Sequence, residues 1–151
     1  ATPFNILTNV EKADVVIGAV LIAGDTAPKV VTKEMVDQMQ ADSIIIDVAV
    51  DQGGCVETIK PTSHSDPTYR IGEVIHYAVP NIPGTVPYTA SISLSNSTYL
   101  YALKLANLGF VEAVKNDSSL AKGVNTVDGQ VTHSAVAQAL GIQHTPLEKL
   151  T

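Results

Sequence analysis

The sequence is poor in features that mark several classes of protein. Its 151 residues include a single cysteine, so the chain cannot form an internal disulfide framework. Nine Lys and Arg face fifteen Asp and Glu, and the net charge of −6 argues against a nucleic-acid surface. No apolar stretch reaches the roughly 18 residues that span a bilayer, and the N-terminal residues lack the pattern of a secretory signal. These absences favour a soluble, cytoplasmic domain.

Several short motifs for phosphate and metal binding are also absent. Neither the GxGxxG fingerprint of dinucleotide-binding folds nor the P-loop pattern GxxxxGK[ST] occurs. The four histidines show neither HxH nor HExxH spacing, so no metal site is predicted. We interpret His64 as a surface-loop residue, His76 as a hydrogen-bonded core or interface residue, His133 as structural and His144 as part of a polar tail.

The segment SIIIDVAVDQGGCVET, residues 43–58, says most about the fold and the position of a functional site. A short β-branched run bounded by turn residues is typical of a strand buried on both faces of a parallel sheet. Such sheets bind ligands beyond the carboxyl ends of their strands, which is where residues 51–54 (DQGG) are expected to lie. Asp47, inside the run, is expected to be a structural group. By position alone, Asp51 is equally well explained as a helix-capping or turn aspartate.

Two further segments repeat this pattern, DVVIGAVLIAG at residues 14–24 and EVIHYAVPNIPG at residues 73–84. Between the first two runs, Met35 and Met39 fall on one face of a predicted helix that Thr32 can cap. Strand, helix and strand at this spacing predict a βαβ unit with a right-handed crossover.

The predicted fold class is therefore α/β: the second half of a Rossmann-like parallel sheet, with three strands, followed by a helical C-terminal tail. We assign residues 1–86 to the half-domain and residues 87–151 to the C-terminal helices. The loop over residues 57–72 is too polar and too proline-broken for a long helix.

The tail is expected to begin with a helix over residues 87–107, which Thr85 can cap and Gly109 stops. Three shorter elements are expected to follow: a helix near residues 110–114, a hairpin at Asp128-Gly129, and a last helix that Thr132 or Ser134 caps and Gly141 ends.

Four long stretches carry a resemblance to a known family: ADVVIGAVLIAGDTAPKVVTKEMV, IIIDVAVDQGGCVETIKPTSHSDP, VIHYAVPNIPGTVPYTASISLSN and AKGVNTVDGQVTHSAVAQALG. Over essentially the whole chain, and in order, the sequence is similar to the carboxyl-terminal part of NAD-dependent alanine dehydrogenases. The related NAD-binding subunit of proton-translocating transhydrogenase typically has glutamate and asparagine where this chain has Asp51 and Cys55. The resemblance therefore favours the alanine dehydrogenase branch.

This resemblance implies reversible oxidative deamination of L-alanine to pyruvate and ammonia, with NAD as the cofactor, by a homo-oligomer that is a hexamer in the family. It makes residues 1–86 the second half of an NAD-binding domain, and residues 87–151 helices that pack on a separate substrate domain. The family's substrate-binding Arg and Lys, its catalytic His and its phosphate loop have no counterpart in this chain. We therefore expect the chain to be inactive by itself.

The resemblance also implies roles for individual residues. Asp51 matches the family's catalytic aspartate. Residues that match cofactor-contacting positions come from three segments: Val20 and Leu21; Val48, Ala49, Val50 and Asp51; and Val79, Pro80, Asn81 and Ile82. The family more often has Ala and Met at the positions of Pro80 and Ile82.

Two other functions remain open. The chain is alternatively a non-catalytic remnant that retains an oligomerisation surface, which the long Ser/Thr-rich helix would provide. A transhydrogenase-like nucleotide-binding subunit is the third interpretation, and Asp51 and Cys55 count against it. Cys55 itself is expected to be a packed small apolar residue, because the sequence places no base or basic cluster beside it.

Overall fold

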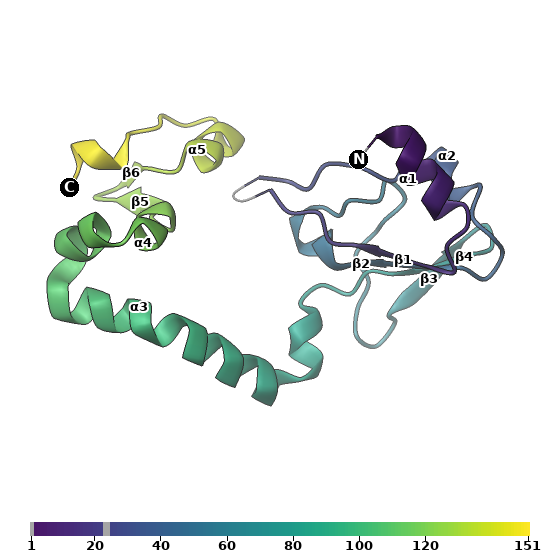
Figure 1. Ribbon diagram of the computed structural model, residues 1–151, viewed down its shortest axis with the longest axis horizontal. Coiled ribbons are helices and arrows are strands. Elements are labelled where there is room, and N and C mark those ends of the chain that lie inside the picture. The colour runs from purple at the N-terminus through teal and green to yellow at the C-terminus, as the bar shows by residue number, and fades with distance from the viewer. Residues whose placement is uncertain (1, 23–24) are drawn as a thin grey trace. The chain divides into compact units, whose positions relative to one another are not determined.

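The computed structural model describes residues 2–22 and 25–151, and the chain divides into two compact units, Ala1–Thr85 and Val86–Thr151 (Figure 1). Residues 23 and 24, the end of the first predicted apolar run, lie outside the described residues.

A four-stranded sheet organises the first unit, in the spatial order β1-β2-β4-β3. Its strands are β1 (Val15–Gly18), β2 (Ile44–Asp47), β3 (Thr68–Ile71) and β4 (Val74–Tyr77). β1, β2 and β4 are parallel, and β3 pairs antiparallel with β4 at one edge. The three predicted parallel strands are thus confirmed, whereas β3 forms inside the segment that we expected to be a loop.

Alternation along the strands decides which side chains form the core. In register across the sheet, Val16, Ile45 and His76 share one face, and Ile45 and His76 are fully buried. The helices α1 (Pro3–Val10) and α2 (Lys33–Val36) lie on one side of the sheet (Figure 1). Together with the sheet they enclose a core of Val10, Val31, Met35, Val36, Ile45, Val56 and Val74.

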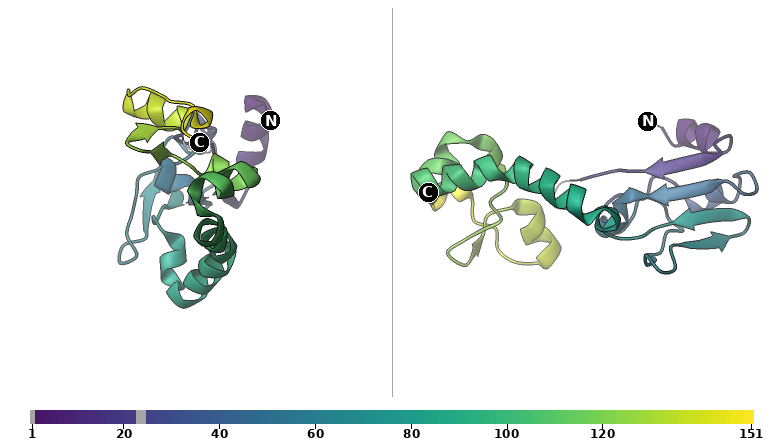
Figure 2. Two further views of the ribbon diagram at one scale, coloured as in Figure 1. Left: turned by 90° about the vertical axis from the view of Figure 1, so that its left-hand side faces the viewer. Right: turned by 90° about the horizontal axis from the view of Figure 1, so that it is seen from below.

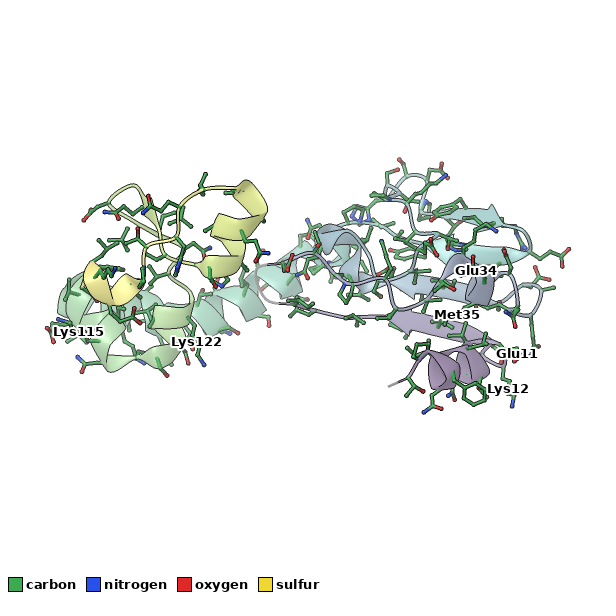
Figure 3. All side chains as sticks on the ribbon, turned by 90° about the horizontal axis from the view of Figure 1, so that it is seen from above. Glu11, Lys12, Glu34, Met35, Lys115 and Lys122 are labelled. Atoms are coloured by element: carbon green, nitrogen blue, oxygen red, sulfur yellow. The ribbon has the colours of Figure 1, made fainter. Side chains whose placement is uncertain are left out.

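The short helix α2 follows the expected capping rule. The Thr32 hydroxyl oxygen accepts the Met35 backbone N–H at 3.4 Å. On the helix, Met35 is buried in the core and the neighbouring Glu34 is exposed (both are labelled in Figure 3). The helix ends at Val36, earlier than the apolar spacing to Met39 predicted, and Met39 reaches the core from the following turn.

β2 also ends earlier than the sequence suggested. The strand stops at Asp47, and residues Val48–Gln52 form the 3₁₀-helix η1. Asp47 caps this helix by accepting the Ala49 N–H at 2.9 Å. Asp51 therefore lies in a helical turn after the strand rather than on the strand end itself.

The longest element of the second unit is the helix α3 (Pro87–Asn116), seen along its length in Figure 2 (right). Gly109 breaks it with φ 72° and ψ 169°, a conformation that is essentially restricted to glycine. The predicted stop at Gly109 and the short helix after it are thus confirmed. Thr85 is not the cap, because Val86 occupies that position and makes no side-chain capping bond.

The elements after α3 are short: α4 (Ser118–Lys122), β5 (Thr126–Val127), β6 (Gln130–Val131), α5 (Ser134–Leu140) and the 3₁₀-helix η3 (Leu147–Lys149). β5 and β6 form the hairpin predicted at Asp128-Gly129. Gly141 ends α5 as expected, but His133 is its N-cap residue, so neither Thr132 nor Ser134 caps the helix.

Among the described residues, no helix is long and apolar enough to cross a membrane. Within the same ranges, no group of three or more His, Cys, Asp or Glu side chains is arranged to hold a metal ion.

Candidate functional site

The turn after β2 is built around the buried carboxylate of Asp47. One of its oxygens accepts the Ala49 N–H at 2.9 Å, and the other accepts the N–H groups of Cys55 and Val56 at 2.8 and 3.1 Å. Asp47 is fully buried. Three backbone donors are what a buried carboxylate needs in place of water, so the structural role expected for Asp47 is confirmed.

Two glycines make this close packing around Asp47 feasible. A Cβ atom on Gly18 would lie 2.5 Å from Cys55 Sγ. A Cβ atom on Gly54 would overlap Ile59 and approach an Asp47 oxygen to 2.9 Å, and Gly54 also has a positive φ of 75°. Neither position accepts a side chain without moving the turn that leads from Asp51 to Val56.

A cavity of about 290 Å³ lies beyond the carboxyl ends of β1 and β2. Seven of the described residues line it: Ala19, Val20, Leu21, Val48, Ala49, Asp51 and Gln52. Five of these are site residues predicted from the sequence. Most of the lining is small or aliphatic, and the Asp51 carboxylate and the Gln52 amide are its polar side chains. The Gln52 Oε1 atom is buried without a hydrogen-bond partner among the described protein atoms.

The third predicted segment, residues 79–82, contacts one residue of the cavity lining, Asp51. The Asn81 backbone N–H donates to both carboxylate oxygens of Asp51, at 3.3 and 3.2 Å. Asn81 has a positive φ of 52°, an unusual conformation that asparagine tolerates better than most residues. Asp51 is therefore held from a neighbouring loop, and it does not cap η1, since Asp47 does.

The other predicted residues do not line the cavity. Val50 and Val79 are buried at 5% and 1% exposure, so their side chains belong to the interior. Pro80 is half-buried, and Ile82 starts the 3₁₀-helix η2 (Ile82–Thr85). Any contact that Val50 or Val79 makes with a ligand would have to come from the backbone.

The cysteine and the core histidine lie outside the cavity. Burial raises the pKa of the Cys55 thiol, which disfavours the reactive thiolate. Burial lowers the pKa of His76, whose Nδ1 lies 3.1 Å from the Val74 carbonyl and whose Nε2 lies 2.8 Å from the Thr58 hydroxyl. The His76 ring stacks on Tyr69 at a centroid distance of 5.0 Å. Both residues are thus buried parts of the interior of the first unit.

Sequence reasoning missed Lys29. Its ammonium group donates to the carbonyl oxygens of Gly53, Gly54 and Val56, which follow Asp51 in the chain. These partners are 24 to 27 positions away in sequence, so no local pattern indicates them.

Comparison with known proteins shows the family to which the chain belongs. The family profile described as "Alanine dehydrogenase/PNT, C-terminal domain" matches residues 1–134. The chain belongs to this family. It is 52% identical to an alanine dehydrogenase of Methanococcus maripaludis over 147 residues, 97% of this chain and 39% of that protein. It is 51% identical to the alanine dehydrogenase of Bacillus subtilis over 150 residues, 99% of this chain and 40% of that protein.

Solved structures show the same likeness. An L-alanine dehydrogenase superposes with a TM-score of 0.76 at 50% identity, covering 93% of this chain and 39% of that one. A transhydrogenase from Sinorhizobium meliloti superposes with a TM-score of 0.63 at 28% identity, covering 89% of this chain and 36% of that one. The fold is therefore the α/β, Rossmann-like fold of this family, and the chain spans about two fifths of the length of these relatives.

Proposed function

We propose that this chain forms the nicotinamide-facing part of the active site of an NAD-dependent alanine dehydrogenase. The reaction is the reversible oxidative deamination of L-alanine to pyruvate and ammonia. The observation that carries the proposal is the carboxylate of Asp51, held by the Asn81 N–H at the rim of a largely aliphatic cavity. The cavity lies in a chain about half identical to alanine dehydrogenases.

The cavity suits a flat, partly apolar ring. Val20, Leu21, Val48 and Ala49 provide aliphatic walls at the strand ends, where open α/β sheets bind ligands. These residues would hold the nicotinamide, and the buried, unpartnered oxygen of Gln52 lies among the lining residues as a free acceptor. NAD, when bound, supplies the hydride acceptor.

The chain's own contribution to the chemistry is electrostatic and proton-transferring. In a site with apolar walls, the Asp51 carboxylate stabilises the positive charge that develops on the substrate nitrogen and carbon as hydride leaves. It also orients the water that attacks the resulting iminium carbon and accepts a proton from that water. The Asn81 N–H keeps the carboxylate at the cavity rim while it does so.

The assembly follows from the same resemblance. We place the protein in the cytoplasm as a homo-oligomer. Residues 1–86 contribute the second half of the NAD-binding domain, and residues 87–151 pack on the substrate domain. The Arg, Lys and His that act on the substrate, and the phosphate loop, belong to parts of the relatives that this chain does not match.

A chimaera tests the proposal. Residues 1–151 would replace the matching two fifths of the Bacillus subtilis alanine dehydrogenase. We expect alanine-dependent NADH formation by the chimaera, and a loss of about 10²-fold in turnover on Asp51→Asn with NAD affinity changed by only a few-fold. Asp66→Asn, on an exposed loop, is the matched control and should leave turnover unchanged.

The outcomes discriminate between the candidate functions. A folded chimaera that binds NAD but forms no NADH, or an Asp51→Asn variant with near-normal turnover, would contradict the assignment. Hydride exchange between NAD and NADP pools without alanine would favour the transhydrogenase-like alternative. The 151-residue chain by itself is expected to form no NADH from alanine and to bind NAD no better than about millimolar, roughly −4 kcal/mol.

A further inference from the structure

The turn over residues 53–56 is held by two side chains of opposite charge. Asp47 accepts its N–H groups, as described above, and Lys29 donates to its carbonyl oxygens. The distances from Lys29 Nζ are 2.6 Å to Gly53 O, 2.8 Å to Gly54 O and 3.3 Å to Val56 O. Two N–H groups and three carbonyl oxygens of this turn are therefore paired with a charged side chain from another segment.

An ammonium group matches this carbonyl cluster in number and charge. Lysine has three N–H donors and no acceptor, and three carbonyl oxygens converge on Lys29. Hydrogen bonds from a charged donor are shorter and stronger than neutral ones, which agrees with the two short distances to Gly53 and Gly54. Without the ammonium, three carbonyl dipoles would point at one another across a small space.

The backbone around Lys29 is itself fixed to the same turn. The Ala27 N–H donates to Gln52 O at 2.9 Å, and the Val30 N–H donates to Cys55 O at 2.9 Å. Lys29 lies between these two bonds, so its Cα position relative to the turn is set by the backbone. Although Lys29 is exposed, its backbone position therefore brings the ammonium group within reach of all three carbonyl oxygens.

The turn depends on the Lys29 hydrogen bonds because its two glycines leave the backbone free to change conformation. Gly53 and Gly54 have φ values of 89° and 75°, and glycine moves between such conformations at little cost. Gly53 is also the C-cap of η1, and its N–H bonds to the Ala49 and Val50 carbonyls. A shift of Gly53 therefore changes the end of the helical turn that carries Asp51.

From this geometry we infer that Lys29 is a positioning residue for Asp51, and this role rests on the function proposed above. Lys29 fixes Gly53 and Gly54, these fix the end of η1, and η1 sets where the Asp51 carboxylate meets the Asn81 N–H. Lys29 touches neither substrate nor cofactor in this scheme.

The first test uses the 151-residue chain and needs no catalysis. In Lys29→Met, which keeps the length of the side chain and removes the charge, the Asn81 amide proton resonance should move toward its position in Asp51→Asn. The Cys55 and Val56 amides should exchange with solvent at least 10-fold faster than in the wild type. Lys33→Met, which removes an exposed ion pair with Asp37, is the matched control and should change neither.

An unchanged Asn81 resonance in a folded Lys29→Met chain would overturn the inference, because it would show that the turn and Asp51 are independent. Lys29→Arg keeps the charge and provides a second variant should the Met variant fold poorly. We expect it to restore the Asn81 resonance at least halfway, since its planar fork meets fewer of the three carbonyls than an ammonium does. No recovery in a folded Arg variant would count against the inference.

The second test measures kinetics in the chimaera. Lys29→Met should lower kcat about 10-fold and change the KM for NAD by less than 3-fold, the pattern of a misplaced catalytic group and not of lost cofactor binding. A rise in the KM for NAD with unchanged kcat would show that Lys29 serves cofactor binding instead. An inactive wild-type chimaera would overturn the proposed function alone, because the resonance test would still decide whether Lys29 positions Asp51.

Discussion

Removing the Asp47 carboxylate should destabilise the first unit more than any change at the cavity. Asp47→Ala leaves the N–H groups of Ala49, Cys55 and Val56 without their acceptor in a fully buried place. Each unsatisfied buried donor costs about 1–3 kcal/mol. We therefore expect the free energy of unfolding to fall by at least about 3 kcal/mol, a large part of the 5–15 kcal/mol that is typical of a domain.

Asp47→Asn keeps the shape of the side chain and changes only its hydrogen bonding. Asparagine keeps one oxygen and places an amide NH₂ where the other stood, so at least one backbone donor loses its partner. The expected loss is about 1–3 kcal/mol, smaller than for alanine. Urea unfolding followed by the NMR signal of an Ile45 methyl group reads the first unit alone, because Ile45 is fully buried in its core. Asp66→Asn is the control.

A loss below about 1 kcal/mol for Asp47→Ala would refute the reasoning. It would mean that water or a rearranged turn satisfies the three N–H groups. The same result would remove Asp47 as the anchor of the turn between Asp51 and Val56.

Two further predictions concern the neighbouring loop and the core histidine. Asn81→Ala in the chimaera should raise the KM for NAD more than it lowers kcat, the signature of lost uniform binding; an unchanged KM for NAD with collapsed alanine binding would place this loop at the substrate. Burial lowers the pKa of His76, so the unfolded chain binds a proton more readily than the folded one as the pH falls below about 6.5. Stability from neutral His76 is therefore fully present above that pH and is lost on acidification toward the lowered pKa. The free energy of unfolding, measured by urea titration between pH 5 and 8, should depend less on pH in His76→Gln than in the wild type. His64→Gln, on an exposed loop, is the control and should follow the wild type. Equal pH dependence in all three proteins would contradict the role given to His76.

The sequence predicted the parallel strands because each is a compact apolar run that ends in small or polar residues. It could not predict β3, whose residues TYRI have no such pattern. This strand depends on distant partners: Tyr69 stacks on His76, and its hydroxyl donates to the Thr58 carbonyl at 3.0 Å. The stacking contact exists only after β4, which carries His76, has paired with β3.

The sequence could not predict where β2 ends either, because VAV after Asp47 is as apolar as III before it. The carboxylate of Asp47 decides it, through bonds to residues two, eight and nine positions later. For the site, position at the strand ends indicated which segments meet at the cavity. It could not indicate that Val50 and Val79 are buried. Val50 lies in the helical turn η1 that replaces the expected strand end, and Val79 lies in the irregular segment that follows β4.

The long helix α3 has a consequence for how stability is distributed along the chain. Up to Gly109 it forms a rod roughly 33 Å long, at a rise of about 1.5 Å per residue, and all side chains from residue 91 to residue 112 are exposed. The hydroxyls of Ser97 and Thr98 bond back to the carbonyls of Ser93 and Leu94, a habit that slightly destabilises helices. Since helices in proteins are stabilised mainly by a packed face, this rod should open locally long before the sheet unfolds. Its amide protons should exchange first, and the helical circular dichroism of the chain should rise whenever another surface covers it.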